Sequence, residues 1–323
     1  MKNREVPSIK KVLLYCYVRK FWVIEVDRMK KVLLLGGSGF IGRNIIEYFA
    51  HSEEYEITAP TSKELNVIDE KSVTDYLTSQ YFDIILHFAV YGDGIDKSKD
   101  GTKMLEYNLR MFLNFEKNSY LYGKMYYAGS GAEYDKSRDI IDVTEDDEGE
   151  NIPTDHYGLM RYTIDKIIRK SDNIYGLKIF GIFGPYEPWW RRFISNCCCK
   201  VIRDIPLSIR QNVYFDYIWI EDFLNILKCL MDKTPNEHVY NVTTGKKVDL
   251  LTLAHMVLKV SGKELPIYVC KEGMGREYTS DNTRLLKELG GYEFTDMEQS
   301  IAKLYKWYEK HEDIIDMSRL LYQ

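Results

Sequence analysis

The first half of the chain alternates short apolar runs with segments of helical periodicity. The apolar runs, which predict β-strands, cover residues 30–35, 55–60, 83–89, 124–130 and 175–182. The segments between them, which predict helices, cover residues 44–49, 71–79, 102–123 and 154–170, the last with Thr154 as its N-cap. A largely apolar run such as 83–89 is typical of a parallel sheet covered on both faces. The alternation therefore predicts a right-handed, doubly wound α/β sheet.

Three glycines occupy the turn between the first apolar run and the first helix. Gly36, Gly39 and Gly42 give the spacing Gly-x-x-Gly-x-x-Gly, with Phe40 and Ile41 inside it. The first glycine allows the tight turn, the second lets a pyrophosphate approach the backbone, and the third lets the helix pack on the strand. Backbone N–H groups and the positive helix end would face the phosphates. An ordinary strand-to-helix turn is the alternative, but the strand before and the helix after favour a dinucleotide site.

The pattern loosens after residue 184, where prolines become frequent. We expect residues 29–184 to form the dinucleotide-binding domain and residues 185–323 mainly a smaller C-terminal lobe that binds the substrate. Some segments of this lobe should return to the first domain. Residues 1–28 precede Met29 and the first strand, so we expect an N-terminal extension there, with an extra strand or an interface arm as the alternative.

Composition narrows the class of protein. The chain has 323 residues, 45% of them hydrophobic, which suffices for a large core. A net charge of −5 gives no sign of a nucleic-acid surface, and no apolar run approaches the roughly 20 residues of a membrane span. Six cysteines without paired spacing favour a reducing, cytoplasmic setting. The run Cys197–Cys199 is expected to pack in the core, and no metal site is expected, because adjacent helical positions point in different directions.

The end of the second predicted strand bears on the choice of dinucleotide. An acidic residue there would bind the adenosine ribose hydroxyls and favour NAD. This chain instead has Ser62 and Lys63, and Arg43 follows the glycine turn. These side chains could receive a 2′-phosphate, so we favour NADP (as NADPH), with NAD possible. Solvated surface cations are the alternative for Lys63 and Arg43.

Several further motifs follow the glycine turn. They are His87-Phe88-Ala89, Asn108, the segment from Ala128 to Tyr134, Pro153-x-x-x-Tyr157-Gly158, the segment from Phe180 to Pro185, the segment from Phe215 to Asp222, Arg276, and the segment from Asp281 to Leu285. Over residues 29–310 this set resembles the extended short-chain dehydrogenase/reductases that act on nucleotide sugars, within the NAD-dependent epimerase/dehydratase family. The stretch from Glu64 to Asp69 is most similar to the GDP-fucose synthase-type 4-ketoreductases.

The resemblance implies a Rossmann-type fold and a set of cofactor contacts. Asn66 and Val67 would line the adenine. Phe88, Ala89 and Asn108 would contribute to the same cofactor site. Members of the family commonly form homodimers through the helices that contain Asn108 and Tyr157. The apolar side chains Leu105, Leu109, Phe112, Leu113 and Phe115 are compatible with that interface, although they could equally face the sheet.

The resemblance also implies a catalytic set. Ser130 would hydrogen-bond the substrate carbonyl, and Tyr157 would donate a proton to it. The family usually places lysine four residues after the tyrosine, to hold the nicotinamide ribose and lower the tyrosine pKa. Here the residue is Arg161, which keeps the charge but cannot release a proton. A second pair, Tyr162 and Lys166, has the expected spacing, but five helical residues rotate it by about 140° from Tyr157.

Absent groups narrow the reaction. Gly131 and Ala132 stand where the 4,6-dehydratases carry an Asp-Glu pair. Ala132 and Tyr186 stand where GDP-fucose synthase carries the cysteine and histidine that epimerise C3 and C5. We therefore expect reduction of the C4 keto group of a nucleotide-linked 4-keto-6-deoxy sugar without epimerisation. The alternatives are a 4-epimerase that retains NAD and a non-catalytic protein that binds the cofactor or the sugar nucleotide.

Cations after residue 185 are candidates for the substrate diphosphate. By resemblance, Arg191, Arg192 and Arg276 would close on it, with Ala132 and Tyr186 beside the sugar. For Arg191 and Arg192 a solvated helix face is an equally good interpretation.

Overall fold

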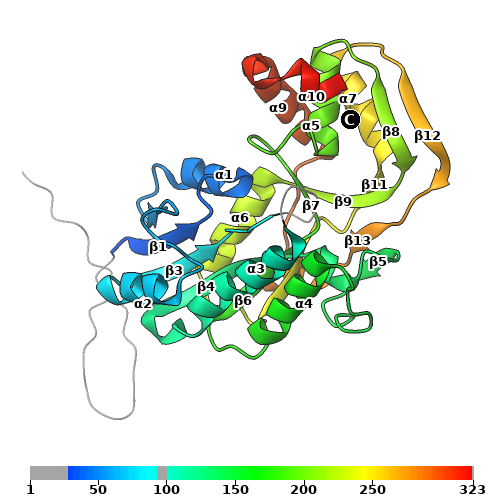
Figure 1. The fold of residues 1–323 in the computed structure, drawn as a ribbon. Helices are drawn as coiled ribbons and strands as arrows, with labels where there is room; N and C mark the ends of the chain where they lie inside the picture. Colours follow the sequence, from blue (N-terminus) through cyan, green and yellow to red (C-terminus); the bar gives the residue numbers. More distant parts are fainter. Residues whose placement is uncertain (1–27, 93–99, 322–323) are drawn as a thin grey trace, which may run out of the picture.

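The computed structural model describes residues 28–92 and 100–321 (Figure 1). A six-stranded parallel sheet has the order β10-β6-β4-β3-β1-β2. Its strands are β1 (Lys30–Leu35), β2 (Tyr55–Thr58), β3 (Phe82–His87), β4 (Tyr122–Ser130), β6 (Ile174–Ile179) and β10 (Val239–Val242). The expected doubly wound α/β fold is confirmed. The N-terminal extension lies outside the described residues except for Arg28, which pairs with Asp83 at 2.6 Å.

Helices cover both faces of this sheet. They are α1 (Phe40–Phe49), α2 (Glu70–Ser79), α3 (Gly101–Glu116), α4 (His156–Ile168) and α6 (Ile220–Met231). One face packs on α2, α3 and α4, and the other on α1 and α6. Strand residues alternate between the two cores, so Leu33 belongs to the first and Leu34 to the second. This division is the reason why the strands are apolar at most positions.

The expected helices begin or end at residues other than those expected. The helix expected over 44–49 begins earlier, at Phe40. The helix expected over 102–123 ends at Glu116, and the short 3₁₀ turn η1 (Ser119–Leu121) follows it before β4 begins. The expectation that Thr154 caps the next helix is wrong, because the N-cap of α4 is Asp155, whose carboxylate accepts from the Gly158 N–H at 2.9 Å. Threonine and aspartate are both favoured N-caps, with aspartate somewhat the better, and the two stand at adjacent positions here.

The C-terminal lobe lies above the sheet in the view of Figure 1. It contains the short strands β5 (Ile140–Val143), β7 (Gly181–Phe183), β9 (Tyr214–Trp219), β11 (Lys247–Asp249) and β13 (Tyr278–Ser280), and the parallel pair β8 (Leu207–Asn212) and β12 (Ile267–Met274). Its helices are α5 (Phe193–Ile202), α7 (Leu250–Ser261), α9 (Met297–Lys310) and α10 (Met317–Leu321), while α8 (Thr283–Leu289) returns to β10. Within the described ranges no helix combines the length and apolarity that a membrane crossing requires.

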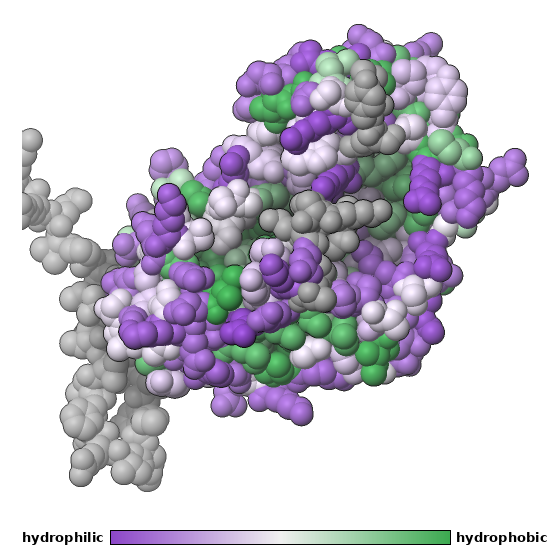
Figure 2. All heavy atoms as spheres, viewed as in Figure 1, coloured by the Kyte–Doolittle hydropathy of each residue, from purple (hydrophilic) through white to green (hydrophobic). Residues whose placement is uncertain are grey.

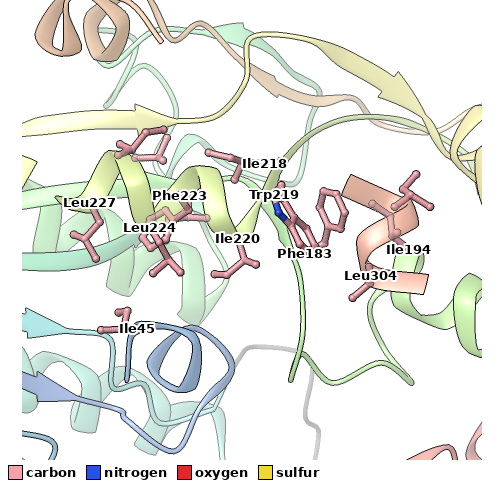
Figure 3. Close-up of a cluster of buried hydrophobic side chains, with 14 of the residues drawn as sticks. Ile45, Phe183, Ile194, Ile218, Trp219, Ile220, Phe223, Leu224, Leu227 and Leu304 are labelled. Atoms are coloured by element: carbon pink, nitrogen blue, oxygen red, sulfur yellow. The ribbon is translucent and has the colours of Figure 1, made fainter. Parts of the chain in front are cut away.

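One apolar core runs from the sheet into the lobe. Figure 3 shows Phe223 and Leu227 of α6 near Ile45 of α1, and Trp219 and its neighbours leading on toward the lobe. The same core continues between α5 and α9, where Leu304 is fully buried. The cysteines 197, 198 and 199 belong to this core, which confirms their expected packing.

The glycine turn is closely packed. Gly36 has φ +88°, and a Cβ there would lie 2.8 Å from the backbone of Phe88 and Ala89. A Cβ at Gly42 would overlap the carbonyl oxygen of Gly36. Both positions therefore require glycine, and the turn keeps its backbone open toward a ligand.

The substitution Gly42→Ala tests this packing. We expect it to destabilise the fold by about 1–3 kcal/mol, because the methyl group has to displace backbone atoms. Thermal unfolding measures the effect. Gly39→Ala is the matched control, since its Cβ would lie 3.3 Å from the nearest atom, the Gly36 carbonyl oxygen, and should cost less. Equal melting temperatures for the two variants would contradict this description of the turn.

Candidate active site

Ser130 ends β4 at the carboxyl edge of the sheet. Its hydroxyl accepts a hydrogen bond from the N–H of Ala132 at 3.2 Å. Ser130 as a whole is 8% exposed. The following 3₁₀ turn, η2 (Gly131–Tyr134), packs tightly, because a Cβ at Gly131 would lie 2.7 Å from the hydroxyl of Tyr278. Topology places ligand sites of open α/β sheets at this edge.

Tyr157 lies in the first turn of α4, facing Ser130. The helix approaches η2 closely at Gly158, where a Cβ would lie 2.8 Å from the Ala132 carbonyl oxygen. Burial alone would raise the pKa of Tyr157, but the charge of Arg161, helped by Ser130 and Lys136, brings it below the usual value. A phenol with a lowered pKa beside a second hydroxyl is suited to give a proton to a carbonyl oxygen.

Arg161 is a buried cation held against Tyr157. Its Nη1 donates to the Tyr127 hydroxyl at 2.8 Å and to the Ala128 carbonyl oxygen. The guanidinium lies 5.1 Å from the ring centroid of Tyr157 and 5.3 Å from that of Tyr127. Burial lowers the pKa of nearby His87 to about 4, so no second positive charge competes with Arg161 from that side chain.

The alternative pair faces elsewhere. Lys166 bonds Glu148 at 2.5 Å and lies 5.2 Å from the ring centroid of Tyr162. Both side chains contact the segment at Gly149. The structure therefore brings Tyr157, and not Tyr162, to Ser130.

The residues expected to bind the cofactor lie around the glycine turn. Gly36 touches Phe88 and Ala89, and the Asn108 amide bonds both backbone groups of Tyr91, which fixes the segment after β3. An open glycine cradle at a helix N-terminus fits a dinucleotide pyrophosphate.

The segment after β2 lies farther along the same edge. The Val67 carbonyl oxygen accepts from Asn114 at 3.0 Å, and the Asn66 side chain accepts from the N–H of Ile68. Ser62 and Lys63 are exposed. Arg43 donates from Nε to the Ser38 carbonyl oxygen at 3.2 Å, inside the glycine turn.

The residues expected to touch the substrate divide into two groups. Arg276 is exposed and donates to the Lys136 carbonyl oxygen at 3.2 Å, and Arg192 lies close enough to Lys136 to affect its pKa. Arg191 is exposed next to Arg192, and Ala132 is fully buried within η2.

Tyr186 lies against α1, so its described contacts give no support for a place beside the sugar. Its hydroxyl donates to Glu47 at 2.5 Å, and its ring packs edge-on against Trp307 of α9. Tyr186 follows the turn at Pro185, and the Pro185 carbonyl oxygen accepts a hydrogen bond from the side chain of Asn44 in α1. Packing of α1 against this turn determines the direction of Tyr186, and the local sequence carries no sign of it.

The sequence of residues 32–243 matches the NAD dependent epimerase/dehydratase family. The chain belongs to this family. The expectation of an NAD(P)-dependent enzyme of the oxidoreductase and epimerase type is thereby confirmed.

The chain is also similar to three individual proteins. The chain is similar to the GDP-L-colitose synthase of Yersinia pseudotuberculosis, with 27% identity over 314 residues, 88% of this chain and 100% of that protein. A GDP-L-fucose synthetase from Naegleria fowleri bound to NADP shares the fold at a TM-score of 0.75, with 14% identity over 90% of this chain and 97% of that one. The GDP-mannoheptose C4 reductase of Campylobacter jejuni with NADP bound has a TM-score of 0.74, with 15% identity over 88% and 99%.

Two residues of this candidate site, Lys136 and Tyr278, are not identified by the sequence analysis. The Lys136 ammonium lies 4.8 Å from the ring centroid of Tyr278, and Tyr278 reaches Ser130. Burial lowers the pKa of Lys136, and the charge of Arg192 adds to that effect. The position of Lys136, two residues after η2, could have suggested it. Tyr278 comes from β13, and only the sheet pairing with β5 and β9 brings it to the site.

The role of Arg161 leads to a titration experiment. Because the Arg161 charge lowers the pKa of Tyr157, Arg161→Met should move the ionisation of Tyr157 to higher pH. The variant also leaves the Tyr127 hydroxyl and the Ala128 carbonyl without their donor, which should destabilise the fold by about 1–3 kcal/mol. The ultraviolet difference between each protein and its Tyr157→Phe derivative isolates the tyrosinate.

Lys166→Met is the control for this titration. It removes a cation from the same helix, but one that faces Glu148, so the Tyr157 titration should stay in place. A Tyr157 titration that does not move in Arg161→Met would contradict the role given to Arg161.

Proposed function

We propose that the chain is an NADPH-dependent reductase of the C4 keto group of a nucleotide-linked 4-keto-6-deoxy sugar. The observation that carries the proposal is the group of Ser130, Tyr157 and the buried Arg161 at the carboxyl edge of the sheet. When bound, NADPH supplies the hydride. The Ser130 hydroxyl would donate to the C4 carbonyl oxygen, and Tyr157 would transfer its proton there as the negative charge develops.

The surroundings of this group support reduction without epimerisation. Removal of a proton from C3 or C5 needs an acid and a base on the two sides of the sugar. Ala132 offers neither, and the Tyr186 hydroxyl is engaged with Glu47, a contact that raises the pKa of Tyr186. Within the described residues, Ser130, Tyr157 and Arg161 remain as the side chains proposed for the hydride step.

The charge at the end of β2 supports NADPH. No carboxylate follows β2 before Glu64, and the Glu64 side chain accepts from the N–H and hydroxyl of Thr61. Ser62 and Lys63 therefore stay available to a 2′-phosphate. The NADP in the two structures named above agrees with this preference.

Arginines at the mouth of the site support a sugar nucleotide as the substrate. Arg192 and Arg276 both approach Lys136, so three cations gather beside Tyr278. A diphosphate would satisfy such a cluster. The three similar proteins described above are named for GDP-sugars, which makes GDP the first nucleotide to test.

A homodimer through α3 and α4 is part of the same proposal. Leu105, Leu109 and Leu113 are spaced along one face of α3 and only partly buried, whereas Phe112 and Phe115 are buried against the sheet. Figure 2 shows apolar surface over the part of the molecule where α3 and α4 lie in Figure 1. Sedimentation of the purified chain tests the dimer.

The buried, free thiols of α5 fit a cytoplasmic location.

The substitution Tyr157→Phe tests the catalytic assignment. NADPH consumption is measured with GDP-, CDP-, dTDP- and UDP-linked 4-keto-6-deoxy sugars, and we expect one nucleotide series to be reduced. Tyr157→Phe should lower that rate by about 10²- to 10⁴-fold, because the proton donor is lost. Tyr162→Phe, on the same helix, should leave it unchanged. Inversion at C4 of a nucleotide sugar that carries a C4 hydroxyl, without net NADPH consumption, would instead indicate the epimerase.

The substitution Lys63→Gln tests the cofactor assignment. Loss of one exposed contact to the 2′-phosphate should weaken NADPH binding by about 1 kcal/mol, or roughly fivefold, and leave NADH binding unchanged. Fluorescence titration of both nucleotides measures this. Lys71→Gln is the control, because Lys71 is an exposed cation of α2 that pairs with Asp75. Equal losses for NADPH and NADH would contradict a 2′-phosphate contact.

A further inference from the structure

A buried charge cluster lies directly beneath the catalytic turn. Lys178 of β6 is completely buried, and its ammonium pairs with Glu133 and, at 3.4 Å, with Asp165. The Tyr134 hydroxyl lies 3.3 Å from the same nitrogen. Glu133 and Asp165 are 1% and 3% exposed, so water does not weaken these interactions.

The cluster joins the two elements that carry the catalytic hydroxyls. Glu133 belongs to η2, three residues after Ser130, and Asp165 belongs to α4, eight residues after Tyr157. Lys178 lies between them on the strand next to β4, where it is the register partner of Gly129. A single ammonium therefore contacts the Ser130 turn and the Tyr157 helix at the same time.

Further charged and polar contacts extend the cluster beyond Lys178. The second oxygen of Asp165 accepts from Arg169 at 2.6 Å, and Arg169 also lies 3.8 Å from Glu148. Tyr134 is held from its other side, because its hydroxyl donates to Asn241 of β10 at 2.9 Å. Each carboxylate thus has a cationic partner, as a buried ion cluster requires.

We propose that Lys178, Glu133 and Asp165 are positioning residues, which set the Ser130 hydroxyl at its working distance from Tyr157. Stability alone does not explain the cluster, because well-packed apolar side chains of the same volume generally stabilise a core as well as a buried ion pair does. Directional contacts to one ammonium fix both elements in a way that apolar packing does not. Displacements near 1 Å at reacting groups cost about 10²-fold in rate.

Two matched substitutions separate positioning from stability. Glu133→Gln keeps the shape of the side chain and removes its charge. Glu288→Gln does the same to a buried carboxylate far from the site, which pairs with Lys233 at 2.9 Å. Both variants should melt at lower temperature. Only Glu133→Gln should lower kcat, by at least about tenfold, with KM for the sugar nucleotide nearly unchanged. Equal kcat for the two variants would overturn the proposal.

A double variant gives a stricter comparison. Glu133→Leu with Lys178→Met removes one charge of each sign and leaves Asp165 paired with Arg169. We expect the double variant to melt at a higher temperature than Glu133→Gln. Its kcat should stay low, because the contacts of the Lys178 ammonium with η2 and α4 are lost. Recovery of kcat together with stability would show that the cluster only stabilises the fold.

The rate measurements rest on the proposed function, but a structural measurement does not. If the unmodified chain reduces none of the sugar nucleotides, the proposed function fails, and the crystal structure of the double variant still decides the positioning role. Movement of η2 away from Tyr157 supports it, and an unchanged distance between the Ser130 and Tyr157 hydroxyls overturns it.

Discussion

The burial of the Arg161 guanidinium is the constraint around which the site is arranged. A buried cation needs hydrogen-bond acceptors, and here the Tyr127 hydroxyl and the Ala128 carbonyl oxygen both accept from Nη1, while the buried Nε has no hydrogen-bond partner among the described residues. Both acceptors belong to β4, which also carries Ser130. The contacts that hold the charge in place therefore also fix α4 against the sheet, and so place Tyr157 opposite Ser130. An arginine that cannot lose its proton keeps this arrangement at every pH that the protein encounters.

Much of the fold could be predicted because burial on both faces leaves a clear mark on a strand. Strands such as β3 and β6 are apolar at most positions, and the turn at Gly36 and Gly42 can be recognised because close backbone contacts exclude side chains there. The start of α4 was assigned one residue too early because Thr154 and Asp155 are adjacent and both are favoured N-caps. The family and the enzyme class followed from motifs that are local in sequence.

The site could be predicted only as far as its parts are local. Ser130 and Tyr157 could be named because each stands in a motif, and the helical rotation separated Tyr157 from Tyr162. Tyr278 and Lys136 meet across more than 140 positions of the chain, and strand pairing in the lobe decides that contact. The direction of Tyr186 depends on α1, and the Lys178 cluster depends on three elements at once. Chemistry that arises from packing between distant segments leaves no periodic signal in the sequence.

The origin of β10 has a consequence for how the chain acquires its fold. Residues 239–242 complete the sheet beside β6 only after the chain has passed through α5, β8, β9 and α6. Until they arrive during synthesis, the free edge of β6 presents unpaired backbone groups, and Tyr134 lacks its Asn241 partner. A fragment that stops at residue 184 would keep the glycine turn and both proposed catalytic hydroxyls but would expose the unpaired backbone groups at the edge of β6. The six-stranded sheet is therefore complete only when residues 239–242, which follow α5, β8 and β9 in the chain, have joined it.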